Sequence, residues 1–133
     1  MGKIEEENKK LAKEFLGALS RADTDWVRDH YAEEMRLWTA GSLPFSGASN
    51  KAAALEGMPQ ILGLFPEGIV FEIEAMTAEG ERVAIEAKSR GTTFRGDLYE
   101  QTYHFLMRAR DGKILEFREY MDTELARKVL VGE

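Results

Sequence analysis

The fold of this chain is decided by residues 99–122, which read YEQTYHFLMRARDGKILEFREYMD. Apolar and polar residues largely alternate on both sides of Asp111-Gly112. A period of two is the pattern of a β-strand whose two faces differ, and Asp-Gly between two such runs is typical of a tight hairpin turn. This stretch therefore predicts two long antiparallel strands.

The same alternation is present upstream, in residues 69–75 and 82–88. Between these two runs lies Glu79-Gly80, which supplies a turn. Residues 69–122 are therefore expected to form a meander of four long strands.

Upstream of residue 69 the apolar residues have mostly helical spacing. Ile4, Leu11, Phe15 and Leu19 lie on one stripe of an expected helix. Pro59 lies inside another expected helix, where it predicts a kink or a restart. The full set of expected elements before and after the meander is a helix at Lys3–Ser20, a helix at Asp25–Tyr31, a short strand at Met35–Trp38, a loop at Ala40–Gly47, a helix capped by Ser49 and ending at Leu64, and a short helix at Glu124–Val129.

Helices and strands are thus segregated along the chain, which indicates the α+β class with an antiparallel sheet rather than a parallel α/β fold. No linker, repeat or low-complexity stretch divides the sequence. We therefore expect one domain spanning residues 1–133.

Composition restricts the chemistry. The chain has 18 Lys and Arg against 24 Asp and Glu, a formal net charge of −6, which argues against nucleic-acid binding. It has no Cys and two His, so we expect no thiol chemistry and no multi-histidine metal site. The sequence also lacks the G-x-G-x-x-G, G-x-x-x-x-G-K-[ST] and H-E-x-x-H motifs, and we expect no metal and no cofactor. The N-terminus has no signal-peptide pattern and no stretch is long and apolar enough for a membrane span, so a cytoplasmic location with no membrane association is expected.

The carboxylates are the more informative residues. Glu119 shares one strand face with Leu115, Phe117 and Met121, so it lies either at a solvated strand end or in an apolar pocket. In a pocket, burial would raise its pKa and suit it to proton transfer. Glu86 lies on the face opposite to Val83, Ile85 and Ala87, and it joins Glu119 only if that face is concave.

The two histidines have plainer interpretations. His30 shares a helical stripe with Trp26 and Val27, which favours a packed, hydrogen-bonded side chain. His104 alternates with Thr102 and Leu106 on an expected strand and favours a structural or surface role.

Two stretches resemble a known superfamily. One runs from Tyr31 to Gly47 with Trp38 and Pro44-Phe45-Ser46-Gly47, and the other runs from Glu86 to Asp122. Together with the helix pattern, they resemble the nuclear-transport-factor-two-like superfamily. The branch most similar is the SnoaL-like one, with its polyketide cyclases, ketosteroid isomerases and limonene epoxide hydrolases.

This resemblance implies a cone-shaped α+β roll. Three N-terminal helices pack on a strongly curved, mainly antiparallel sheet that encloses an apolar pocket, and a short C-terminal helix follows. It also implies a homodimer and a small hydrophobic or ring-containing ligand. The side chains expected to surround that ligand are Trp38, Met58, Leu62, Gln101, Phe105, Phe117 and Met121.

The roles of individual residues carry over only in part. The position of the catalytic base in ketosteroid isomerases matches Trp38, which cannot serve as a base. The position of the Asp in their oxyanion hole matches Tyr103 or His104. The epoxide hydrolase Arg matches Arg82, one of its two acids matches Glu119, and the other matches an alanine two residues before Glu86. The candidate catalytic set is therefore Glu119, Glu86, Tyr103, Arg82 and His104.

Three functions remain open at this stage. The first is a cofactor-independent enzyme in which Glu119 serves as general acid or base for isomerisation, cyclisation or epoxide and water-addition chemistry. The second is a non-catalytic binding protein with the same pocket. The third is a dimeric scaffold, which a pocket filled by Trp38 and Met58 would favour.

Overall fold

A computed structural model describes residues 2–133 of the chain. The helices are α1 (Lys3–Arg21), α2 (Thr24–His30), α3 (Lys51–Leu62) and α4 (Thr123–Ala126), which continues as a π-helical turn, η1 (Arg127–Val131). The strands are β1 (Tyr31–Thr39), β2 (Gly47–Asn50), β3 (Ile69–Glu79), β4 (Arg82–Thr92), β5 (Leu98–Arg110) and β6 (Lys113–Met121).

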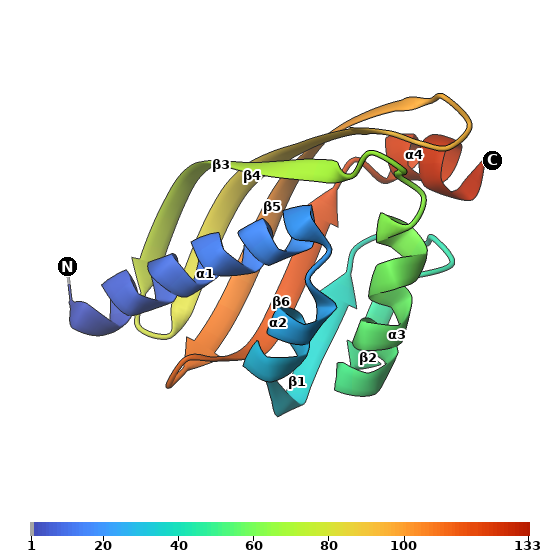
Figure 1. The fold of residues 1–133 in the computed structure, drawn as a ribbon. Coiled ribbons are helices and arrows are strands. Elements are labelled where there is room, and N and C mark those ends of the chain that lie inside the picture. Colours follow the sequence, from blue (N-terminus) through green and yellow to red (C-terminus); the bar gives the residue numbers. More distant parts are fainter. Residues whose placement is uncertain (1) are drawn as a thin grey trace.

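The six strands form one sheet in the order β2-β1-β6-β5-β4-β3. Neighbouring strands are antiparallel except for β1 and β6, which are parallel. The N-terminal helices α1 and α2 lie across one face of the sheet, and α3 stands beside β1 (Figure 1). The predicted α+β class, the mainly antiparallel sheet and the short C-terminal helix are confirmed.

The long helix α1 covers the sheet through one apolar stripe. Leu11, Phe15 and Leu16 are almost fully buried, whereas charged residues occupy the opposite side. Burying each such side chain contributes about 1.5–3 kcal/mol, so this stripe is what holds the helix on the sheet. Within residues 2–133, no helix combines the length and the apolar character that crossing a membrane requires.

The hairpin between β5 and β6 sets which side chains share a face. Asp111 and Gly112 both have positive φ angles, 51° and 76°, as a tight two-residue turn between twisted strands requires. In the resulting register Glu119 is opposite Phe105. Because Phe105 is buried in the core, Glu119 also projects to the inner, helix-covered face of the sheet.

The first half of the chain differs from its prediction in three places. The strand β1 begins at Tyr31 and runs for nine residues, whereas a short strand at Met35–Trp38 was expected. The expected loop ends in an additional edge strand, β2. The residue that caps α3 is Asn50 and not Ser49, because the Asn50 side chain accepts a hydrogen bond from the Ala53 amide at 2.9 Å.

Two helix ends also differ. The helix α3 continues through Pro59 to Leu62 without a restart, and it is followed by two tighter turns in which the Leu64 and Phe65 amides donate to carbonyls three residues earlier. At the C-terminus, α4 begins at Thr123, one residue before the expected helix, and Asp122 caps it, since the Asp122 carboxylate accepts from the Leu125 amide at 3.2 Å.

Candidate active site

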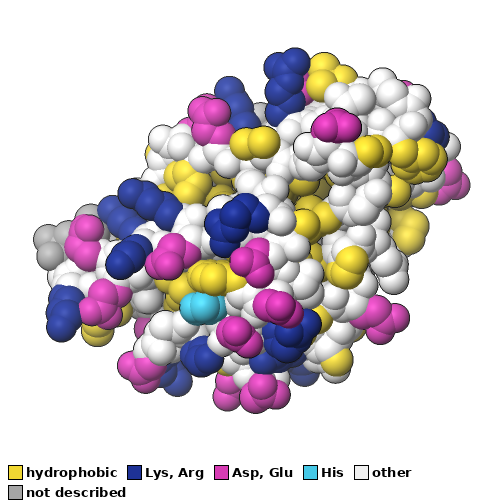
Figure 2. Space-filling view, viewed as in Figure 1, with side chains coloured by type: hydrophobic (Ala, Val, Ile, Leu, Met, Phe, Trp, Pro, Cys, Tyr) yellow, Lys and Arg dark blue, Asp and Glu magenta, His cyan; other side chains and the backbone are white. Residues whose placement is uncertain are grey.

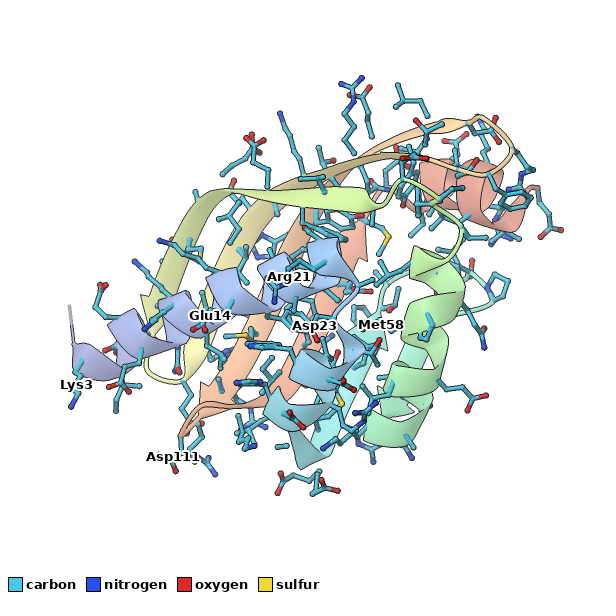
Figure 3. The ribbon with its side chains drawn as sticks, viewed as in Figure 1. Lys3, Glu14, Arg21, Asp23, Met58 and Asp111 are labelled. Carbon is cyan, nitrogen blue, oxygen red and sulfur yellow. The ribbon has the colours of Figure 1, made fainter. Side chains whose placement is uncertain are left out.

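A cavity of about 560 Å³ lies between the inner face of the sheet, α1 and α3. This volume is in the range of pockets that bind small organic ligands. Most of its wall is apolar or aromatic, and the sheet, both helices and the loop before β2 contribute to it. Met58 of α3 is one of the lining residues and lies on the side of that helix nearer to α1 and α2 (Figure 3).

Glu119 is the one carboxyl among the lining residues that the structure describes. It projects inward for the same reason as Phe117 and Met121, which share its face of β6 and also line the cavity. Since Glu119 is only partly exposed and lines the cavity, its accessible surface belongs to the cavity rather than to the exterior.

The surroundings of Glu119 favour its neutral form. Burial raises the pKa of Glu119 to about 7, against a hydrogen bond from Thr39 that lowers it. In that bond the Thr39 hydroxyl donates to Oε2 of Glu119 at 3.1 Å. The two residues are partners across the parallel pair of β1 and β6, so the backbone register holds the hydroxyl beside the carboxyl. Near neutral pH, Glu119 can therefore both donate and accept a proton.

Three tyrosines of the cavity wall, Tyr31, Tyr99 and Tyr103, lie within electrostatic range of Glu119. Burial is the main cause that raises the pKa of each hydroxyl, and the negative charge of Glu119 raises it further. All three hydroxyls therefore stay protonated at neutral pH and can act as hydrogen-bond donors.

Two of these hydroxyls are held by protein groups. Tyr103 and Ser89 share a hydrogen bond of 2.8 Å. The Gln101 amide nitrogen donates to the Tyr99 hydroxyl at 2.9 Å and to the Asp122 carbonyl at the same distance. The Gln101 side-chain oxygen also accepts hydrogen bonds from two backbone amides. Both polar atoms of this side chain are therefore engaged within the protein, where they join β5 to the start of α4.

The residues predicted to surround a ligand divide into two groups. Met58, Leu62, Phe117 and Met121 line the cavity. The other three do not: Phe105 packs behind the wall against Phe117, with ring centroids 4.9 Å apart, Gln101 is buried as described, and Trp38 points to the outer face.

The predicted catalytic residues divide in the same way. Glu119 and Tyr103 line the cavity, but Glu86, Arg82 and His104 are exposed and lie on the outer face of the sheet. The alternation in β4 explains this, since Val83, Ile85 and Ala87 occupy the inner, core-facing positions. The structure therefore does not bring Glu86 and Glu119 together.

Trp38 belongs to an aromatic cluster on this outer face. The Arg118 guanidinium lies 4.1 Å from the centre of the Trp38 ring, and Tyr120 packs on Trp38 with ring centroids 5.2 Å apart. His104 meets Tyr120 edge-on at 6.3 Å. By contrast His30 is packed as predicted, stacked on Trp26 and hydrogen-bonded to the Trp26 carbonyl at 2.8 Å.

Sequence reasoning missed Thr39, Tyr31 and Tyr99 as cavity residues. Thr39 and Tyr31 fall outside the short strand that was expected, although both are paired with residues of β6. Tyr99 had a signal that could have been used, because it shares the inner face of β5 with Tyr103 and Phe105.

The loop before β2, the end of α3 and the C-terminal turn also contribute to the cavity wall, the last through Leu130. The loop is held by Ser46, whose hydroxyl donates to the Ala40 carbonyl and accepts from the Leu43 amide. Hydrophobic surface gathers at the α4 end of the molecule, whereas charges of both signs cover the α1 and α2 region (Figure 2).

Comparison with known proteins agrees with this architecture. A family profile described as the SnoaL-like domain matches residues 12–117, and the chain belongs to this family, within the NTF2-like superfamily. A search of curated proteins finds no match.

Solved structures share the fold over almost the whole chain. A putative SnoaL-like polyketide cyclase from Jannaschia sp. CCS1 has a TM-score of 0.84 at 17% identity, covering 100% of this chain and 97% of that one. An NTF2-like protein from Burkholderia xenovorans LB400 has a TM-score of 0.72 at 27% identity, covering 92% and 95%. Another, from Anabaena variabilis, has a TM-score of 0.79 at 23% identity, covering 92% and 94%.

Proposed function

We propose that this protein is a cofactor-independent enzyme that performs acid/base chemistry on a small hydrophobic molecule, with Glu119 as the proton-transfer group. The reaction types that fit are isomerisation, cyclisation, and epoxide or water addition. The observation that carries the proposal is a single carboxyl, among the lining residues that the structure describes, on the wall of a mostly apolar cavity, with a pKa of about 7 because of burial.

The chemistry follows from the two protonation states of Glu119. The ionised carboxyl takes a proton from one atom of the ligand, and the protonated form returns it at another, so an isomerisation needs no co-reactant. Tyr31 supports this role, since it lines the cavity and its hydroxyl stays protonated. Such a hydroxyl can donate a hydrogen bond to an oxygen that gains negative charge in the transition state.

The test is turnover of a panel of epoxides, enones and aldol-type substrates by purified protein. We expect Glu119→Gln to lower the rate about a hundredfold or more, because positioned acid/base groups contribute on that scale. Glu86→Gln is the matched control, since it removes an equivalent carboxyl from the outer face of the sheet. No turnover by the wild type, or equal rates in the two variants, would contradict the proposal.

Binding without chemistry is the second candidate. It is favoured by the hydrogen bonds that already hold the Tyr99 and Tyr103 hydroxyls, which leave fewer free polar groups for catalysis. It predicts saturable thermal stabilisation by a ligand that is recovered unchanged. The scaffold hypothesis is weaker, because Trp38 lies outside the cavity and Met58 lines it without filling it.

A homodimer and a cytoplasmic location also remain proposals. The dimer is supported by the partly exposed aromatic cluster of Trp38, Arg118 and Tyr120 on the outer face, which offers a surface for a second copy. Light scattering after size exclusion tests it: a particle twice the chain's 15.1 kDa is expected, and a monomer at micromolar concentration would contradict it.

A further inference from the structure

The part of the cavity wall that the structure describes carries an acidic side chain and no basic one. Among the lining residues that the structure describes there is one carboxyl, Glu119, and there is no Lys, Arg or His. An anionic ligand would have to leave water without meeting a cation, beside a group that becomes negative itself. The free energy lost by removing such an unpaired charge from water is much larger than the free energy gained from contacts in the cavity.

A cationic ligand, in contrast, finds a partner of opposite charge in Glu119. Within residues 2–133, the Thr39 hydroxyl is the one side chain that hydrogen-bonds to Glu119, and it occupies Oε2. The other carboxylate oxygen remains for a ligand. An ammonium group that donates to this oxygen forms a charge-assisted hydrogen bond, which is stronger than a bond between neutral groups.

The aromatic wall adds a second attraction for a cation. Eight of the lining residues are Phe or Tyr. Phe117 is two residues from Glu119 on the same strand face, and its ring centre is 4.8 Å from that of Phe15, which is in turn 5.9 Å from Tyr31. The faces of such rings carry negative charge and attract a desolvated ammonium group.

From these observations we infer that the cavity selects its ligand by charge, taking a hydrophobic molecule with one basic nitrogen and rejecting carboxylates. The inference rests on the proposed function, whose site it shares, and it names the class of substrate for that site. The ammonium nitrogen hydrogen-bonds to Glu119, and the apolar body of the ligand occupies the space between α3 and the sheet.

The selectivity must depend on pH through Glu119 alone. The other titratable groups that face it are Tyr31 on β1 and Tyr99 and Tyr103 on β5, and all three stay protonated because burial raises their pKa. The helices α1 and α3 contribute no titratable side chain to the described cavity wall. A preference for an amine should therefore grow as Glu119 ionises between pH 6 and pH 8.

The test uses three naphthalenes that differ in one substituent: an aminomethyl, a hydroxymethyl or a carboxyl group. Their affinities for the full chain are measured by calorimetry at pH 6 and pH 8. At pH 8 we expect the amine to bind about tenfold more tightly than the alcohol, and the acid to bind more weakly than both. Glu119→Gln should bring the amine to the affinity of the alcohol, whereas Glu86→Gln should leave the preference intact.

The inference is overturned if the acid binds as tightly as the amine, if the alcohol binds more tightly than the amine at pH 8, or if Glu86→Gln removes the preference as fully as Glu119→Gln. An alcohol that binds without any amine preference overturns the charge selection and leaves the proposed acid/base function standing. Failure of the proposed function is separate, since it is measured by turnover and not by these affinities.

Discussion

The two faces of β6 carry adjacent residues in opposite environments. Phe117, Glu119 and Met121 line the cavity, while Arg118 and Tyr120 lie on the outer face beside Trp38. Two glutamates show the same contrast: Glu119 lines the mostly apolar cavity, and Glu86 on β4 is exposed. Position on the pleat, and not residue type, therefore decides which carboxyl can become a proton-transfer group.

The largest effect should come from removing an inner side chain. Phe117 is 1% exposed and packs on Phe15 and Phe105, so Phe117→Ala should lower the free energy of unfolding by about 3–5 kcal/mol. Tyr120→Ala, at an outer position that is 38% exposed, should cost less than about 1 kcal/mol. Urea denaturation measures both, and similar losses would mean that the two faces do not differ as described.

The next effect concerns the charge of Glu119 and depends on pH. The pKa of Glu119 is about 7 in the folded chain and near 4.5 in the unfolded one. Burial of this carboxyl therefore does not lower the free energy of unfolding below pH 4.5, where the group is neutral in both states, and the loss of stability is complete above pH 7, where it is ionised in both. Glu119→Gln should therefore stabilise the protein at pH 8, by up to about 3 kcal/mol, and have little effect at pH 4.

Glu86→Gln supplies the comparison for that experiment. Because Glu86 is exposed, the substitution should change the free energy of unfolding by less than about 0.5 kcal/mol at either pH. If Glu119→Gln behaves like Glu86→Gln at pH 8, Glu119 is solvated and is not buried in the cavity wall.

A smaller effect is expected at Thr39. Thr39→Val keeps the shape of the side chain and removes the hydroxyl that donates to Glu119, so the pKa of Glu119 should rise above 7. The lost hydrogen bond should lower stability at pH 8 by about 1 kcal/mol. Thr39→Ser retains the hydroxyl and should preserve the pKa. An NMR titration compares them, and a pKa that falls in the valine variant would contradict the assignment.

The smallest effect should be on the outer face. Arg118→Met keeps most of the length of the side chain and removes the cation over Trp38, which should cost less than about 1 kcal/mol. Because the cavity lies on the other side of the sheet, the affinity for a cavity ligand should stay unchanged in this variant. A large loss of that affinity would place the ligand on the outer face.

Much of this arrangement could be predicted from the sequence. The alternation in β6 placed Glu119 with Phe117 and Met121, and Asp111-Gly112 predicted the hairpin. The face of Glu86 was also correct, because Val83, Ile85 and Ala87 take the inner positions, but periodicity alone does not say which face of a sheet is concave.

Two errors at the site, which concern Thr39 and Trp38, have a common physical cause, namely pairing between distant segments. The parallel pairing of β1 with β6 extends the strand to Thr39 and creates the hydrogen bond to Glu119, and local patterns do not contain that information. Trp38 was expected among the pocket residues that the resemblance implies, but one residue of register puts it on the outer face, beside Arg118.

The pKa of Glu119 decides whether the cavity holds a proton-transfer group that is active near neutral pH. Carbon-detected NMR of the glutamate side-chain carboxyls follows each titration from pH 3 to pH 9, and the Glu119→Gln variant identifies the resonance. We expect one carboxyl to titrate near pH 7 in the wild type and to be missing from the variant. If the resonance that disappears in the variant titrates near pH 4.5 in the wild type, the cavity does not dehydrate Glu119 and the proposed chemistry fails.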